Sequence, residues 1–320
     1  MKKLLFIAPF LGFLLLTACE EPKQGNDSFA IIPTSSKSVK TDEVTKLDDY
    51  WYQGKAEISS YQLEQARYSD VHPGEAVLVF VTEDFLTDKQ VKNDNYTNKN
   101  SAPILKNNFL RKFTTGVYDY SIMTSVFTPT ETNKFPQTQK VTISSQDWCG
   151  QSYMQINQQK DKYKVELRSY FESEGDKNYT INGAILEDEI FNRIRMNPNK
   201  LPTGKTQLIP SATIVRLMHL DMKPMDVEIS KSAYSGNEFE QANLMAYEIN
   251  YPTLKRKLTI LYQKEAPYII EGWTDNYTAL SRQQLTTKAT RKKTLLSPYW
   301  QQHSSKDVKL RKDLEITVFE

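Results

Sequence analysis

Short segments in which hydrophobic and polar residues alternate recur from Tyr50 onward, with polar and turn residues between them. The alternation is regular at 55–68, and 76–81 is a continuous apolar run typical of a buried strand. Short connections within 244–274 favour a three-stranded meander there. Further strands are predicted at 117–127, 140–145, 152–156, 163–171, 227–231, 244–251, 257–263, 268–273 and 280–287. The pattern predicts a mainly β fold, an antiparallel barrel or a strongly curved sheet.

One segment, 184–195, has helical spacing instead and predicts one short α-helix, which Asn197-Pro198 would end. Its first half contains three consecutive acids, Glu187, Asp188 and Glu189. They could be read as a metal or acid–base cluster. Consecutive side chains on a helix point in different directions, however, and acids are favoured near a helix N-terminus. We therefore interpret the three acids as structural.

The first nineteen residues have the pattern of a bacterial lipoprotein signal. Lys2 and Lys3 precede an uncharged run that ends in Leu-Thr-Ala-Cys19, which resembles a lipobox. The run has about 15 residues, whereas a spanning helix needs about 20. The sequence therefore predicts a signal peptide at 1–18 and lipid attachment at Cys19; the alternatives are a transmembrane helix or a secretory signal that leaves Cys19 as a free thiol. The expected location is the cell envelope, at the outer membrane. The protein could face either the periplasm or the cell surface.

Composition divides the rest of the chain. Residues 19–46 are polar and predict a flexible tether, 47–300 a β domain or two packed β subdomains, and 301–320 a tail or an edge strand. Removing the signal from the 320-residue chain leaves 39 basic and 39 acidic residues, so nothing favours nucleic acid as a partner. One strip is basic: 282–312 has nine Lys or Arg and a single acid. It is interpreted as an exposed strand and tail, or as a surface for anionic lipid or polysaccharide.

Only two cysteines are present, and lipid would occupy Cys19, so the mature chain has no internal disulfide. Trp148 and Gly150 flank Cys149 in a manner that suits a packed strand end. Cys149 is therefore predicted to be a buried structural thiol, with a reactive or partner-bridging thiol as the alternative.

The segment 146–153 (Gln-Asp-Trp-Cys-Gly-Gln-Ser-Tyr) resembles the active-site segment of papain-type hydrolases. The resemblance implies that Gln146 is the oxyanion donor, Ser152 replaces the nucleophile and Cys149 is structural, with His303 as the distant base. The family's following Asn-x-Trp is absent, and 153–156 alternates like a strand where the family has a helix. These four residues are weak catalytic candidates.

Metal and nucleotide motifs are incomplete. Thr203-Gly204-Lys205-Thr206 ends like a phosphate-binding loop, but the leading glycine of that motif is replaced by Asn199. The three histidines lie far apart in the sequence, and no zinc-ligand set can be assembled. No cofactor and no metal are therefore expected.

The strings 50–58, 113–120 and 146–151 resemble those of a group of uncharacterised Bacteroidota lipoproteins, over nearly the whole chain after the tether. Members are sometimes labelled "septum formation inhibitor Maf", which implies a cytoplasmic nucleotide pyrophosphatase. The Maf pattern begins with a Ser-x-x-Arg loop, where this chain has its lipoprotein signal.

Three functions follow as expectations. The first is a non-catalytic envelope lipoprotein that binds an apolar or amphipathic ligand, or an envelope protein, in a curved β-sheet. The second is an enzyme, either a hydrolase centred on 146–153 or the pyrophosphatase that the label implies. The third is a purely structural or assembly lipoprotein of the envelope.

Overall fold

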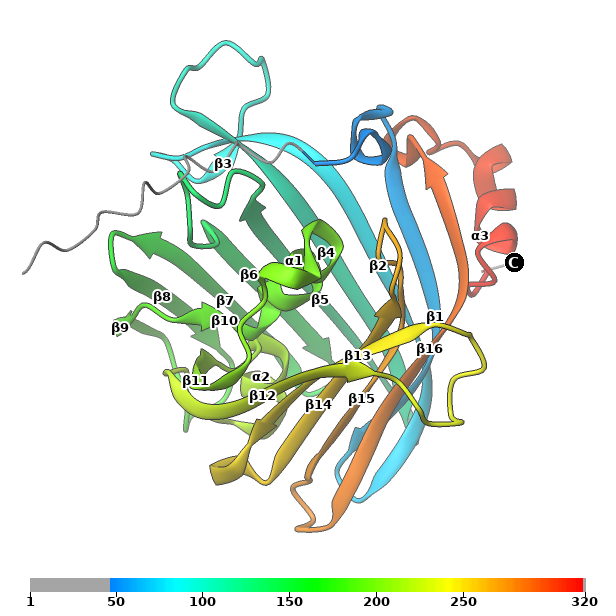
Figure 1. The fold of residues 1–320 in the computed structure, drawn as a ribbon. Coiled ribbons are helices and arrows are strands. Elements are labelled where there is room, and N and C mark those ends of the chain that lie inside the picture. Colours follow the sequence, from blue (N-terminus) through cyan, green and yellow to red (C-terminus); the bar gives the residue numbers. More distant parts are fainter. Residues whose placement is uncertain (1–46, 319–320) are drawn as a thin grey trace, which may run out of the picture. The chain divides into compact units, whose positions relative to one another are not determined.

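The computed structural model describes residues 47–318, and most of them belong to one sheet of sixteen strands (Figure 1). The predicted signal peptide, Cys19 and the tether lie outside the described residues. In chain order the strands are β1 (Ala56–Arg67), β2 (Asp70–Leu86), β3 (Val91–Lys92), β4 (Ser101–Thr115), β5 (Tyr118–Pro129), β6 (Lys140–Asp147), β7 (Gly150–Gln159), β8 (Lys162–Ser169), β9 (Lys177–Asn182), β10 (Ile185–Leu186), β11 (Gly204–Ile209), β12 (Met225–Ala233), β13 (Leu244–Tyr251), β14 (Arg256–Gln263), β15 (Ile270–Thr278) and β16 (Gln284–Ser297).

Strand order confirms a mainly β, mostly antiparallel fold. The sheet runs from β10 through β11–β16 to β1, and then through β2 and β4–β8 to β9, with β3 paired to β2 alone. The first and last strands, β1 and β16, are therefore neighbours in its middle, and only the β10–β11 pair is parallel.

The expected barrel or strongly curled sheet does not form, because the sheet stays open between β9 and β10. A barrel would need these two edge strands to pair. Instead β10 is only two residues long, and the chain turns from it directly into a helical segment. The helical segment covers one face of the sheet, which we call the inner face (Figure 1).

The helical segment is shorter than the single helix that the sequence predicts. The predicted helix at 184–195 is a 3₁₀ turn, η2 (Glu187–Glu189), followed by α1 (Ile190–Met196), and the described chain has two more short α-helices, α2 (Ala212–Met218) and α3 (Lys309–Asp313). The remaining 3₁₀ turns are η1 (Asp49–Tyr52), η3 (Pro198–Lys200), η4 (Pro252–Leu254), η5 (Tyr299–Gln301) and η6 (Ser305–Val308).

Aromatic side chains fix α1 to the inner face. The ring of Phe191 lies 5.3 Å from Phe109 on β4 and 5.6 Å from Trp273 on β15, and those two rings lie 5.0 Å apart. Three strands separate β4 from β15 in the sheet, so the sheet bends around α1. The buried aromatic rings join its two halves into one core.

The apolar run 76–81 lies within β2 and is buried, as predicted, because both faces of β2 are covered. Leu78 and Phe80 belong to the inner core, whereas Val79 and Val81 pack with Leu314 on the opposite, outer face. Alternate residues of a strand point to opposite faces, so covering both removes the usual polar alternation. Residues 301–318, expected as a tail or an edge strand, form η6 and α3 on this outer face.

Candidate ligand-binding site

The hairpin β6–β7 places Gln146 and Ser152 on opposite faces of the sheet. Ser152 is directly opposite Ser145, whereas Gln146 is opposite Gln151. Directly opposed residues share a face and successive residues alternate. Ser152 is accordingly buried while Gln146 is exposed, so Gln146 cannot serve as oxyanion donor to a Ser152 nucleophile.

His303 and Ser152 lie on opposite faces of the sheet. His303 lines a groove on the outer face with residues of β1, β2, β4, β5 and β16. Ser152 shares the inner face with Met154, two positions further along β7, which packs against α2. The structure does not bring Gln146, Cys149, Ser152 and His303 together, and its geometry opposes the papain-like interpretation.

Cys149 is exposed in the turn between β6 and β7, so the interpretation of a buried structural thiol is wrong. The backbone N–H of Cys149 donates to the Asp147 carboxylate at 2.7 Å, which closes the turn. Trp148 is 70% exposed beside it. The turn therefore presents its apolar and sulfur-containing side chains to solvent.

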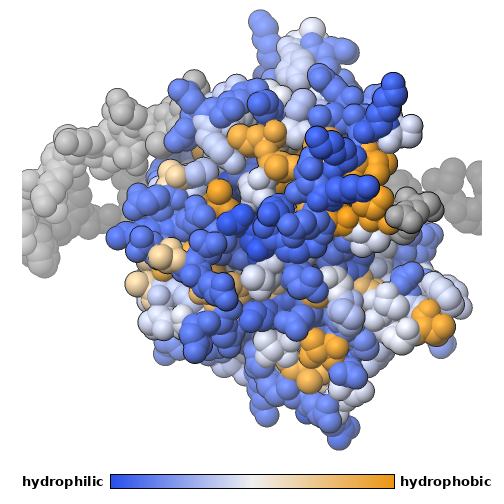
Figure 2. Space-filling model, turned by 90° about the vertical axis from the view of Figure 1, so that its right-hand side faces the viewer, coloured by the Kyte–Doolittle hydropathy of each residue, from blue (hydrophilic) through white to orange (hydrophobic). Residues whose placement is uncertain are grey.

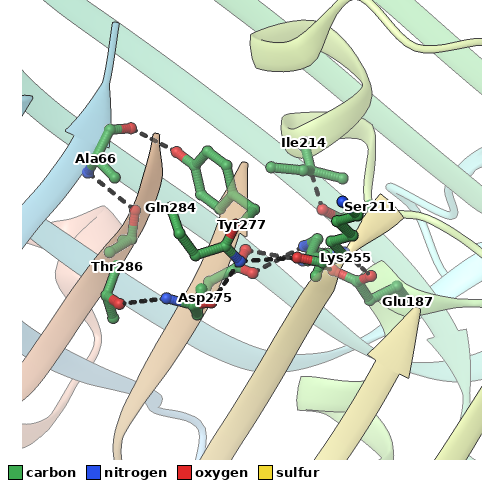
Figure 3. A network of polar contacts seen from close by, with 12 residues as sticks. Ala66, Glu187, Ser211, Ile214, Lys255, Asp275, Tyr277, Gln284 and Thr286 are labelled. Carbon is green, nitrogen blue, oxygen red and sulfur yellow. Dashed lines mark hydrogen bonds and ion pairs between the residues drawn. The ribbon is translucent and has the colours of Figure 1, made fainter. Parts of the chain in front are cut away.

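A buried ion cluster fastens η2 to the sheet. Arg256, on β14, donates to both oxygens of Glu187 at 2.6 and 2.7 Å and to both oxygens of Asp275, on β15, at 2.8 Å each. Figure 3 shows Glu187 and Asp275 on opposite sides of this network. Burial raises the pKa of Glu187, but Arg256 outweighs it and holds that pKa below its usual value. Burial raises the pKa of Asp275.

The neighbouring acid, Asp188, positions the next helix. Its Oδ2 accepts the backbone N–H of Ala212, the first residue of α2, at 2.8 Å. Arg111, on β4, donates to Thr213 at 2.9 Å in the following position. Burial raises the pKa of Asp188 to about 7 and lowers the pKa of Arg111 to about 10. Two arginines thus face three carboxylates, and below a pH of about 7 the protonation of Asp188 balances their charge.

The cavity beside this cluster has a volume of about 40 Å³. One probe sphere of about 10–15 Å³ holds a water molecule, so the cavity suits a few waters and excludes an organic substrate. The three acids of η2 are buried and engaged in the fold: Glu187 with Arg256 on β14, Asp188 with the start of α2, and Glu189 with Thr138 and Arg193. This agrees with their interpretation as structural. Within residues 47–318 no group of three or more His, Cys, Asp or Glu side chains could hold a metal ion, and no helix there is long and apolar enough to cross a membrane.

A much larger hollow, which we call the edge cleft, lies between α2 and the inner side of β7–β9. Its volume is about 840 Å³, within the 300–1,000 Å³ typical of small-molecule sites. Its apolar lining consists of Met154, Leu167, Ile181, Val215, Leu220 and Met222. Methionine side chains adapt readily to irregular ligands, so this lining suits a flexible hydrocarbon.

Arg216, on α2, lines the same cleft and is only 5% exposed. Its guanidinium carbon lies 4.6 Å from the centre of the Phe171 ring, and its Nη2 is 3.9 Å from the Asp147 carboxylate. Within the described chain its Nε and Nη1 have no hydrogen-bond partner. Buried N–H groups without partners are costly, so Arg216 can donate hydrogen bonds to a further anionic oxygen.

A hydrogen bond between His219 and Glu174 joins the two sides of the cleft rim. Nδ1 of His219, which follows α2, lies 2.5 Å from Oε1 of Glu174, in the loop after β8. Glu174 also accepts the Ser169 hydroxyl. Burial alone would raise the pKa of Glu174, but hydrogen bonds from Ser169 and His219 outweigh burial and lower it. The loop and the end of α2 are therefore fixed on either side of the opening.

Comparisons with family models, curated proteins and solved structures found no match to the chain. The resemblance to Bacteroidota lipoproteins stays a prediction, as does the activity that their label implies. The edge cleft must therefore be interpreted from its own residues.

Sequence reasoning did not select Arg216. The only local signal is a single charge in the apolar stretch of α2, Ala-Thr-Ile-Val-Arg-Leu-Met. The papain-like segment contains Asp147, whose carboxylate lies 3.9 Å from Arg216. A charged residue among apolar helix positions was the signal that could have indicated the site.

Proposed function

We propose that this protein is a non-catalytic lipoprotein of the cell envelope that binds an anionic amphipathic ligand in the edge cleft. The ligand would have a hydrocarbon chain and one acidic head group, a carboxylate or a phosphate. The observation that carries the proposal is Arg216, a nearly buried cation with unpartnered N–H groups at the wall of an otherwise apolar cleft. Apolar walls with a few placed polar groups are typical of small-molecule sites.

Each part of such a ligand has a counterpart. The hydrocarbon would lie on Met154, Ile181 and Met222, where leaving water is favourable. The acidic group would accept hydrogen bonds from Arg216, whose planar fork matches two oxygens of a carboxylate or phosphate. Without the ligand, Asp147 at 3.9 Å is the nearest counter-ion of Arg216 in the described chain, and it leaves two nitrogens unsatisfied.

The envelope location rests on the predicted signal and Cys19. In its own bacterium the wild-type protein should partition with membranes, and Cys19→Ser should move it to the soluble fraction. A Cys19→Ser protein that stays in the membrane fraction would contradict the lipid anchor while leaving the cleft proposal intact.

Cys149 offers a direct measurement of ligand binding. It is the one thiol within the described residues, is exposed, and lies in the turn that contains Asp147. An environment-sensitive fluorophore on Cys149 should respond to palmitate below its micelle concentration and much less to hexadecanol, which has the same chain without the charge. Equal binding of the two compounds would overturn the proposed role of Arg216.

The matched variants are Arg216→Gln and Arg282→Gln, the second in an exposed turn between β15 and β16. Arg216→Gln should remove the preference for palmitate, a loss of about tenfold or more in affinity given that hydrogen bonds to charged groups contribute about 1.5–3 kcal/mol. Arg282→Gln should bind like the wild type. Native mass spectrometry of protein extracted from its own membrane should then detect the natural ligand.

A further inference from the structure

The last part of the described chain combines exposed aromatic residues with a concentration of positive charge on the outer face. Trp300 is 46% exposed, Tyr299 36% and Val308 38%. Exposed lysines follow on η6 and α3. We call these six residues the C-terminal patch: Tyr299, Trp300, Lys306, Val308, Lys309 and Lys312.

Helix geometry places the cations and Val308 together. Lys309 and Lys312 are three positions apart, and Val308 and Lys312 four, so they share one side of the helical segment. Two acids lie among them. The Asp307 carboxylate accepts from the backbone N–H and the hydroxyl of Ser304 at 2.9 and 2.8 Å, so it is engaged as a cap, and Asp313 is exposed at the end of α3. The three lysines of the patch outnumber these two acids.

An apolar groove of about 560 Å³ lies directly beside the patch. Tyr299 and Val308 line it together with Val77, Leu110 and Leu295 from the sheet. Figure 2, viewed from the side of α3, shows hydrophobic residues next to strongly hydrophilic ones on this face. Apolar and cationic surfaces thus lie side by side.

We infer that the C-terminal patch rests on an anionic lipid bilayer. Trp and Tyr are enriched at membrane–water interfaces because their rings are apolar with one polar end. Lysines beside them are attracted to negatively charged head groups. A surface with both kinds of side chain can place its aromatic rings at the membrane–water interface and its lysines against the anionic head groups. The inference goes beyond ligand binding in the edge cleft, which lies at the β9 edge of the sheet, whereas the groove beside the patch lies over the middle strands β16, β1 and β2.

Tryptophan fluorescence can test the inference on the full exported protein in vesicles. Trp51 and Trp273 are buried, so lipids with brominated chains can quench only Trp148 and Trp300 by contact. In phosphatidylglycerol vesicles the wild type should be quenched, Trp148→Phe should keep that quenching, and Trp300→Phe should lose most of it. Quenching should also fall in phosphatidylcholine vesicles, because the attraction requires anionic lipid.

A charge-reversed variant, Lys306→Glu with Lys309→Glu and Lys312→Glu, separates the lysines from the aromatic residues. It should lose the quenching that depends on anionic lipid while its circular dichroism stays that of the wild type. Quenching that Trp300→Phe leaves unchanged would overturn the inference. So would a dimer that Trp300→Phe dissociates with no quenching by lipid, because the patch would then be an interface between two copies.

Discussion

Arg256 and Arg216 are both nearly buried, yet their surroundings differ completely. Arg256 donates four hydrogen bonds to two carboxylates, one on η2 and one on β15. Arg216 has one carboxylate at 3.9 Å and two nitrogens without a partner in the described chain. Burial of a charge therefore does not by itself indicate function. A saturated arginine holds the fold together, whereas an unsaturated one at a cleft wall is available to a ligand.

The largest expected effect is the loss of Arg256. Arg256→Met should lower the free energy of unfolding by about 3–5 kcal/mol, because Glu187 and Asp275 would stay buried without their cation. Urea unfolding followed by circular dichroism measures the change. Lys255→Met, at the preceding and more exposed position, is the control and should change stability little. Equal stability of the two variants would contradict the structural role of the cluster.

Much of this cluster could not be predicted from the sequence. Alternation predicted β1 and β6 to β8 well, and the helical spacing within 184–195 correctly predicted that Ile190 and Ile194 form the buried side of α1. The sequence indicated that the acids of η2 are structural, but the partner of Glu187, Arg256, is 69 positions away. Pairings over such distances depend on strand order, which local patterns do not encode.

Other elements were missed for identifiable reasons. In β4 the buried positions include Asn107, and charged residues such as Lys112 interrupt its apolar residues, so the alternation is weak. The open edge was also missed. The β10 strand is only two residues long, and α1 and α2 cover the inner face through contacts that no strand pattern contains.

A second prediction uses pH to examine the same cluster. The pKa of Asp188 is about 7 in the fold, against about 3.9 for an unperturbed Asp, so the folded state binds the proton more tightly. Its contribution to stability is present at low pH and is lost as pH rises from about 4 through 7. The amide side chain introduced by Asp188→Asn cannot ionise but can still accept a hydrogen bond from the Ala212 N–H. The stability of this variant should therefore not show the decrease between about pH 4 and pH 7.

The expected difference is large enough to measure. Between pH 5 and pH 8, Asp188→Asn should gain roughly 2–3 kcal/mol of stability relative to the wild type, because about two units of the pKa difference fall in this range, at 1.36 kcal/mol each. Urea unfolding of both proteins at each pH gives the comparison. Glu64→Gln, with an exposed side chain on β1, serves as the control. Parallel stability curves for wild type and Asp188→Asn would show that the buried carboxyl does not take up a proton in this range.

The smallest effect on folding is expected at Arg216. Arg216→Met removes a charge whose hydrogen bonds are incomplete, so the free energy of unfolding should change by no more than about 1 kcal/mol without ligand. Palmitate should raise the unfolding temperature of the wild type but not of the variant, because only the folded cleft with Arg216 binds it tightly. Differential scanning calorimetry with and without palmitate measures both quantities. If Arg216→Met lowered the free energy of unfolding as much as Arg256→Met, Arg216 would be a structural cation like Arg256, and the proposed difference between the two arginines would be wrong.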